Sequence, residues 1–150
     1  MTSRALVEDF VAQRRLAVVG ASRSGKKFGN AVVRELTAKG YAVTPVHPTA
    51  ETIDGLPCAS SLLGLHDAVD GVVVVVPPAH AVDVVHEAAD AGIRRVWLQQ
   101  GAGSPEALAL AAEKGLSAVD GECILMFAEP VTSFHRFHRW VWNLLGKAPN

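Results

Sequence analysis

The sequence has 150 residues, of which 49% are hydrophobic and 19% are charged. This length and composition fit one globular domain with a full-sized core and exclude a disordered or fibrous chain. The formal net charge of -1 creates no global field that would attract nucleic acid or an anionic membrane, so any anion site must be local. The longest apolar run, Val72 to Ala79, is too short to span a bilayer and is interrupted by two prolines. We therefore expect neither a nucleic-acid nor a membrane partner.

Apolar periodicity alternates with glycine and proline along the chain and gives the expected elements. A leading helix is expected over residues 3–13, a strand over 16–20, a helix over 30–40 and a strand over 41–46. A strand is expected within 70–78, a helix over 79–92, a strand over 94–99, a helix over 104–115 and a strand over 116–119. Between them, residues 48–65 are less regular and predict a short strand or turn near 53–58 and a helical turn at 60–65. A final helix is expected over residues 133–146.

Three of these helices are followed by a glycine and then by a short strand, at Gly40, Gly92 and Gly115. Glycine suits the left-handed conformation that closes a helix. The valine-rich strand before Pro77 is apolar throughout, as in the centre of a parallel sheet. Parallel strands need crossover helices, so we predict one α/β domain over residues 1–150. Its fold is expected to be a doubly wound, mostly parallel sheet of about five strands with flanking helices and an extra C-terminal helix.

The N-terminus lacks the basic region and the long apolar run of a secretory signal peptide. The two cysteines, Cys58 and Cys123, do not form a disulfide framework, and their spacing is not that of a zinc site. We therefore expect a cytoplasmic protein with reduced thiols and no bound metal ion. His135 and His138, three residues apart in the final helix, are expected to be surface residues rather than metal ligands. The apolar residues of that helix can pack on the sheet or form a homodimer interface, and both interpretations stay open.

The turn after the first strand reads "GASRSGKKFG" over residues 20–29 and raises the question of function. Gly20 to Lys26 spell G-x-x-x-x-G-K, the start of a nucleoside-triphosphate loop. That loop needs Ser or Thr in the next position to bind magnesium, and Lys27 stands there instead. The strand "VVVVV" also ends in Pro77 rather than in the Asp of such sites. These two differences argue against an NTPase.

The same turn opens a helix near Phe28, and a helix N-terminus offers unpaired N–H groups to a pyrophosphate. Its glycines do not follow the G-x-G-x-x-G spacing, and the second strand ends at His47 rather than at the acidic residue that binds the ribose of NAD. Three cations, Arg23, Lys26 and Lys27, lie in the turn and suit a ligand with more than one cluster of phosphates. The alternative is a solvated turn whose lysines serve solubility.

Several segments together resemble the CoA-binding domain family. They are "VVGASRSGKKFGNAV", "YAVTPVHP", "GLPCASSLLGL", "VVVVVPP" and "RRVWLQQGAGSPEALALAAEKGL", followed by a late cysteine. The resemblance runs from about Arg14 to Cys123, which is most of the chain. The family consists of small Rossmann-like proteins related to the N-terminal domain of the succinyl-CoA synthetase alpha subunit and to ADP-forming acetyl-CoA synthetases. The resemblance implies a Rossmann-like parallel sheet with coenzyme A as its ligand.

By position, the resemblance implies a set of ligand contacts at the strand ends, to which Lys26 is added for its charge. They are Gly20, Ala21, Ser22, Arg23, Lys26, Lys27, Phe28 and Gly29 in the first turn, His47 and Pro48 after the second strand, Val76, Pro77 and Pro78 after the third, and Gln99 and Gly101 after the fourth. His47 replaces the family's usual asparagine. The prolines are expected to flank the adenine end. Because parallel strands end at one edge, these residues should line one crevice, with the pyrophosphate on the N–H groups of residues 22–28.

These observations predict a protein that binds CoA or an acyl-CoA and is not catalytic on its own, as a carrier, sensor or partner subunit. No catalytic residue is assigned, because the sequence requires no Ser-His-Asp or Cys-His arrangement. The synthetases work through a phosphorylated histidine in a second domain, which these residues do not include. Two alternatives stay open: an NAD(P)-dependent oxidoreductase, and the nucleotide-binding subunit of an acyl-CoA ligase that needs a partner chain.

Overall fold

The centre of the protein is a five-stranded sheet in the order β2-β1-β5-β6-β7, seen in a computed structural model that describes residues 3–128. Its strands are β1 (Arg15–Val19), β2 (Ala42–Val46), β5 (Gly71–Val74), β6 (Arg95–Gln99) and β7 (Ser117–Glu122). All four neighbouring pairs are parallel. All four residues of β5 are buried, which confirms the central position expected for the valine-rich strand.

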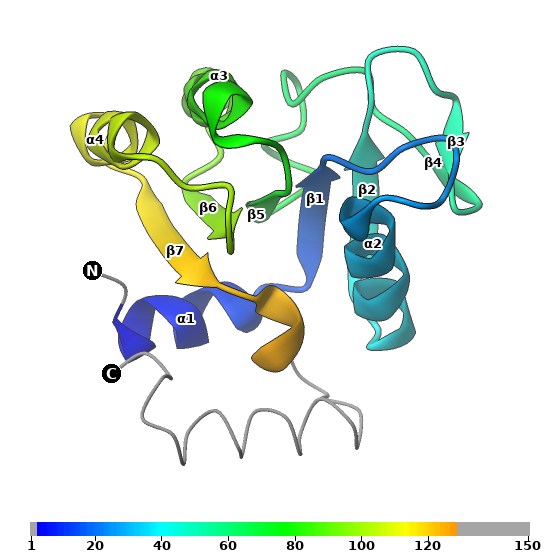
Figure 1. The fold of residues 1–150 in the computed structure, drawn as a ribbon, viewed down its shortest axis with the longest axis horizontal. Helices are drawn as coiled ribbons and strands as arrows, with labels where there is room; N and C mark the ends of the chain where they lie inside the picture. The colour runs from blue at the N-terminus through cyan, green and yellow to red at the C-terminus, as the bar shows by residue number, and fades with distance from the viewer. Residues whose placement is uncertain (1–2, 129–150) are drawn as a thin grey trace.

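Helices cover both faces of this sheet (Figure 1). One face carries α3 (Pro78–Asp90) and α4 (Pro105–Glu113), and the other carries α1 (Arg4–Val11), α2 (Phe28–Ala38) and the 3-10 turn η1 (Ile124–Met126). Each face of the sheet has its own apolar core, and alternate residues of a strand pack in one core or the other because successive side chains point to opposite faces. Thus Val72 and Val74 belong to the core on the side of α3 and α4, whereas Val73 belongs to the core on the side of α1 and α2. The doubly wound, Rossmann-like α/β fold is confirmed.

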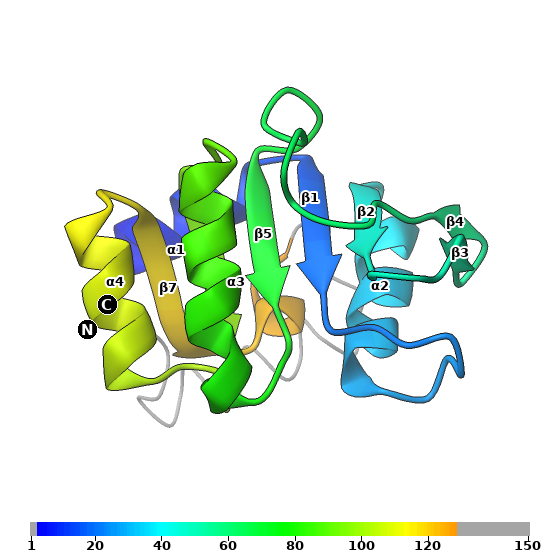
Figure 2. The same cartoon turned by 90° about the horizontal axis from the view of Figure 1, so that it is seen from above.

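The strand order places a switch point between β1 and β5. The chain runs from β1 through α2 to β2 on one side, and then returns to β5 on the other side of β1. Figure 2 shows that the connections leaving β1 and β5 emerge at the same edge of the sheet. Open α/β sheets bind ligands at this kind of position, beyond the carboxyl ends of the strands.

The segment between β2 and β5 contains a short hairpin and a turn. A short antiparallel hairpin, β3 (Thr52–Ile53) and β4 (Leu56–Pro57), lies where a short strand or turn is expected. Residues 60–65 form bends and a single turn, closed by the N–H of Leu65 on the carbonyl oxygen of Leu62 at 3.1 Å, where a helical turn is expected. The backbone N–H of Leu62 donates to a carboxylate oxygen of Glu87 on α3, and the Leu62 side chain is buried. The segment is therefore bound to α3 in addition to its own turn hydrogen bond.

The chain ends of the described part also bear on the predictions. β7 runs to Glu122, past the expected end of its strand, with a register shift opposite Leu98 and Gln99. The final helix, with His135, His138 and the apolar residues considered for a homodimer, lies outside the described residues. Over residues 3–128, the helices are too short or too polar to span a membrane.

Candidate functional site

The turn between β1 and α2 is held close to the sheet by two glycines. A Cβ atom on Gly20 would lie 2.1 Å from the carbonyl oxygen of Val75, and Gly20 has a φ of +128°. A Cβ on Gly29, which has ordinary helical backbone, would lie 2.5 Å from the carbonyl oxygen of Gly20. Only residues without a side chain allow the end of β1, the exit of β5 and the start of α2 to come this close. These contacts explain two of the three glycines in the motif.

A buried asparagine organises the interior of the turn. Asn30 is fully buried, and its Oδ1 accepts hydrogen bonds from the N–H groups of Ser22 at 3.0 Å and Lys27 at 3.3 Å. Its Nδ2 donates to the carbonyl oxygen of Ser22 at 2.9 Å and to Oδ2 of Asp54 at 3.0 Å. One side chain therefore ties the start of the turn to its end and to the β3–β4 hairpin. A buried amide with these partners is stabilising, whereas an unpaired one is costly.

This network decides which backbone donors remain for a ligand. The N–H groups of Ser22, Gly25, Lys26 and Lys27 already have acceptors within the turn. Among the described residues, the structure records no acceptor for the N–H groups of Arg23, Ser24, Phe28 and Gly29. The last two are the first N–H groups of α2, where the helix dipole also favours an anion. Not all the backbone N–H groups of residues 22–28 are therefore available to a ligand.

The cations of the turn are solvent-accessible. Arg23, Lys26 and Lys27 are exposed, and none of the ion pairs recorded over residues 3–128 includes them. An Nη2 donor of Arg23 reaches the hydroxyl of Thr49, in the loop after β2. This contact brings the guanidinium towards the second strand end and leaves its other donors for a ligand. The aromatic ring of Phe28 is half exposed beside the lysines.

His47 supports the loop after β2. Its Nδ1 accepts hydrogen bonds from the N–H groups of Thr49 at 3.1 Å and Ala50 at 3.0 Å. An asparagine at this position would offer its Oδ1 to the same kind of turn, so the histidine in place of the family's asparagine still performs a loop-capping role. Pro48 follows as an exposed residue.

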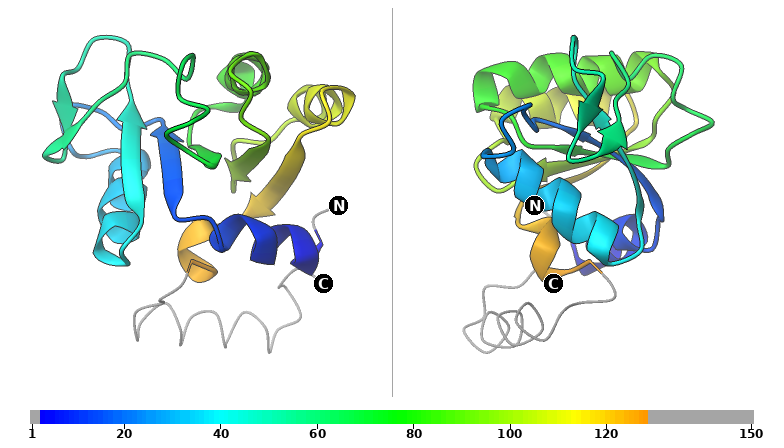
Figure 3. Two further views of the ribbon diagram at one scale, coloured as in Figure 1. Left: turned by 180° about the vertical axis from the view of Figure 1, so that it is seen from behind. Right: turned by 90° about the vertical axis from the view of Figure 1, so that its right-hand side faces the viewer.

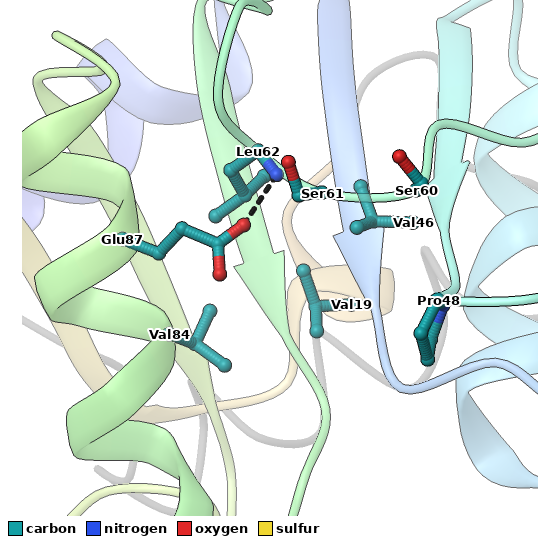
Figure 4. Close-up of a pocket in the computed structure, with 8 residues that line it drawn as sticks. All are labelled: Val19, Val46, Pro48, Ser60, Ser61, Leu62, Val84 and Glu87. Carbon is teal, nitrogen blue, oxygen red and sulfur yellow. Dashed lines mark hydrogen bonds between the residues drawn. The ribbon is translucent and has the colours of Figure 1, made fainter.

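A pocket opens beside this loop, on the face covered by α3 (Figure 4). Its volume is about 220 Å³, and its lining is mostly apolar. The lining residues are Val19, Val46, Pro48, Ser60, Ser61, Leu62, Val84 and Glu87. Figure 4 shows Glu87 with one carboxylate oxygen on the N–H of Leu62 and the other directed towards Val84. Since Val19 precedes Gly20 and Pro48 precedes Thr49, the pocket adjoins the turn that carries the cations.

The other predicted contact residues are distributed unevenly. Pro77 and Pro78 are exposed at the start of α3, as the N-cap and first residue of that helix, and Val76 is half-buried before them. Gln99 is 2% exposed, and its Oε1 accepts from the N–H of Ile124 at 3.1 Å. Gly101 is exposed in the loop after β6. The contacts recorded for Gln99 thus lead to η1 and not to the turn, while the first two strand ends come together around the turn and the pocket.

Several residues of this region were not among those expected from sequence. They are Val19, Asn30, Val46, Thr49, Asp54, Ser60, Ser61, Leu62, Val84 and Glu87. The dipeptide Asp54-Gly55 does signal a tight hairpin turn. A polar residue at position 30, ahead of the apolar run of α2, is a weaker signal. Nothing in the sequence connects Glu87 to the segment 60–62, which lies 25 residues away.

Two titratable groups outside the turn, Glu122 and Cys58, have shifted pKa values. Burial raises the pKa of Glu122, and the neighbouring carboxylate of Asp120 raises it further. Burial also raises the pKa of the Cys58 thiol, which makes that group a weaker nucleophile. Over residues 3–128, the structure holds no cluster of three or more side chains of the types that ligate metals.

Comparison with known proteins identifies the family of this chain. A model described as "CoA binding domain" matches residues 14–129. An ADP-forming acetate–CoA ligase of Archaeoglobus fulgidus is 34% identical over 90 residues, which are 59% of this chain and 13% of the ligase. The chain therefore spans only a small part of that curated relative.

Two solved structures show the same fold. A conserved hypothetical protein from Pyrococcus furiosus has 40% sequence identity and a TM-score of 0.70, over 74% of this chain and 96% of that one. The apo form of a dinucleotide-forming acetyl-coenzyme A synthetase from Candidatus Korarchaeum cryptofilum has 29% identity and a TM-score of 0.62, over 70% of this chain and 25% of that one. With the family match over most of its length, this chain belongs to the CoA-binding domain family and is related to the corresponding domain of ADP-forming acetate–CoA ligases.

Proposed function

We propose that this chain binds coenzyme A or an acyl-CoA at the carboxyl edge of its sheet and catalyses no reaction on its own. The observation that carries the proposal is the turn between β1 and α2, in a chain of this family. It combines free N–H groups at a helix start with three exposed cations. Backbone donors and cations together suit the several phosphates of CoA better than a single anion.

The pocket beside the turn supports an extended ligand. Its volume of about 220 Å³ lies below the range of about 300–1,000 Å³ that is usual for sites enclosing a whole ligand. It therefore suits one end of a longer molecule whose charged part lies on the neighbouring turn. Apolar walls from Val19, Val46 and Val84 and a few polar groups are typical of a site for a ring system.

A second candidate is a subunit of an acyl-CoA ligase that acts with a partner chain. It is favoured by the similarity to an ADP-forming acetate–CoA ligase, of which this chain spans only 13%. In that case the bound CoA would be a substrate delivered to a site on the partner. An NAD(P)-dependent oxidoreductase is less well supported, because the residue that follows β2 is His47 and not an acidic residue.

Titration calorimetry with CoA, dephospho-CoA, NAD and ATP tests the proposal. We expect CoA to bind with a micromolar Kd, and binding to weaken as salt is raised because phosphates meet cations. NAD or ATP binding without CoA binding would contradict it. Incubation of the CoA complex with acetate, ATP and magnesium, followed by assay for acetyl-CoA and ADP, tests the non-catalytic part. Product formation by the chain alone would contradict that part.

A further inference from the structure

Asp54 lies at the tip of the β3–β4 hairpin, next to the turn that carries the cations. Its φ is +50°, which aspartate tolerates at the first position of an Asp-Gly hairpin turn. Figure 3 shows the hairpin at the end of the sheet beyond β2, alongside the connection from β1 to α2. The side chain of Asp54 approaches the backbone of the turn, since a Cβ built on Gly25 would lie only 3.7 Å from Oδ1 of Asp54.

The carboxylate of Asp54 makes two directed contacts. Its Oδ2 accepts from Nδ2 of Asn30 at 3.0 Å, and its Oδ1 accepts from Nη1 of Arg34 at 3.2 Å. The same Nη1 donates to the carbonyl oxygen of Gly25 at 3.1 Å. The side chain of Asp54 is 15% exposed, against 53% for Arg34, so the acid is the inner member of the pair. Asp54 thus holds both the middle of the turn and the residue that organises its ends.

The contact to Nδ2 favours the same orientation of the Asn30 amide as its three hydrogen bonds to the backbone of the turn. With Nδ2 directed at Asp54 and at the Ser22 carbonyl, Oδ1 is left to accept from the N–H groups of Ser22 and Lys27. A flipped amide would place Nδ2 against two donors and Oδ1 against two acceptors. A carboxylate at position 54 therefore adds a fourth hydrogen bond that supports the other three.

A carboxylate so close to an anion site would by charge alone oppose the binding of phosphate. Its position makes sense if the order that it gives to the turn outweighs this repulsion. We propose that Asp54 is a positioning residue for the phosphate-binding turn, which it holds in its binding conformation through Asn30 and Arg34 before any ligand arrives. The expected effect of Asp54 on ligand affinity rests on the proposed function. The expected effect of Asp54 on the order of the ligand-free turn does not.

Calorimetry on the Asp54→Ala variant tests the role in binding, with Glu51→Ala as the matched control. Glu51 is an exposed acid beside the same hairpin, and its carbonyl accepts from Cys58. We expect Asp54→Ala to weaken CoA binding about tenfold, as for the loss of one net hydrogen bond to the ordered turn. Pantetheine, which has no phosphate, should bind both variants as it binds the wild type. Unchanged or tighter CoA binding by Asp54→Ala would overturn the proposal, since the repulsion between the carboxylate and the phosphates would then equal or exceed the benefit of an ordered turn.

Amide hydrogen exchange in the ligand-free protein tests the same claim without a ligand. We expect the N–H groups of Ser22 and Lys27 to exchange at least several-fold faster in Asp54→Ala than in Glu51→Ala, while the strand amides of β1 remain equally protected. Equal exchange at these two positions would overturn the positioning role. If wild-type protein failed to bind CoA while this difference appeared, the proposed function would fail and the positioning role would stand.

Discussion

Replacing Gly29 with alanine sets two physical effects against each other. Alanine is favoured over glycine within a helix by up to about 1 kcal/mol, and Gly29 has ordinary helical backbone, so propensity alone predicts a more stable protein. The new Cβ, however, would lie 2.5 Å from the Gly20 carbonyl oxygen and 2.8 Å from the Ala21 nitrogen. Ordinary contact begins near 3.4 Å, so α2 and the end of β1 must separate by about 0.9 Å.

We expect the steric effect to dominate, because the atoms in contact are backbone atoms that cannot rotate away. Overpacking of this kind costs about 1–3 kcal/mol. Taking the middle of that range, about 2 kcal/mol, and subtracting the gain in propensity of about 1 kcal/mol, we expect a net loss of about 1 kcal/mol, which lowers the Tm by about 2–4 °C in a domain of this size. Urea unfolding followed by circular dichroism measures it. The neighbouring variant Ala31→Gly serves as the control, because it reports propensity in the same helix. A Gly29→Ala protein as stable as the wild type, or more stable, would refute the reasoning.

Three further predictions concern charged side chains. The hydrogen bond from Arg15 lowers the pKa of Asp70. The contribution of this bond to the free energy of unfolding is therefore fully present above the pKa of about 3.9 in the unfolded chain, and it is lost as the pH falls through the pKa of Asp70 in the folded protein. The stability difference between wild type and Asp70→Asn should therefore be seen at pH 7 and disappear near pH 2 in urea titrations. Burial raises the pKa of Glu122. Ionisation of Glu122 therefore destabilises the folded protein as the pH rises through the folded-state pKa of this group. We expect Glu122→Gln to be more stable than the wild type at pH 7 but not at pH 4. Glu87→Ala should lose about 1–3 kcal/mol because the N–H of Leu62 loses its acceptor, whereas Glu87→Gln, which keeps an acceptor, should lose less. Equal losses in the two Glu87 variants would contradict the assigned contact.

The fold was accessible from sequence because each of its signals is local. The helix–glycine–strand repeats at Gly40, Gly92 and Gly115 need only neighbouring residues to be recognised, and all three glycines have positive φ in the structure. The valine run of β5 likewise indicated a strand buried on both faces. At residues 60–65 a turn is present, but its hydrogen bond to Glu87, a residue of α3 far along the chain, could not be predicted.

The candidate site could be predicted from the sequence only where its residues form a continuous motif. The turn from Gly20 to Gly29 could be located, but the residues that order it could not. Asn30 gains its importance from Asp54, which a separate hairpin brings within 3.0 Å. Gln99 was expected at the ligand crevice from the family resemblance, and its role there stays a prediction; the structure adds that its Oε1 accepts from the N–H of Ile124 in η1.

The central claim is that CoA binds on the turn between β1 and α2, and an NMR titration of the amide groups tests it most directly. With unlabelled CoA added to ¹⁵N-labelled protein, we expect the largest shifts at Phe28 and Gly29, whose N–H groups are free to bind phosphate. Smaller shifts should follow at Val46 and Ser61 in the neighbouring pocket. No shifts, or shifts confined to the opposite edge of the sheet around Arg15, would contradict the account.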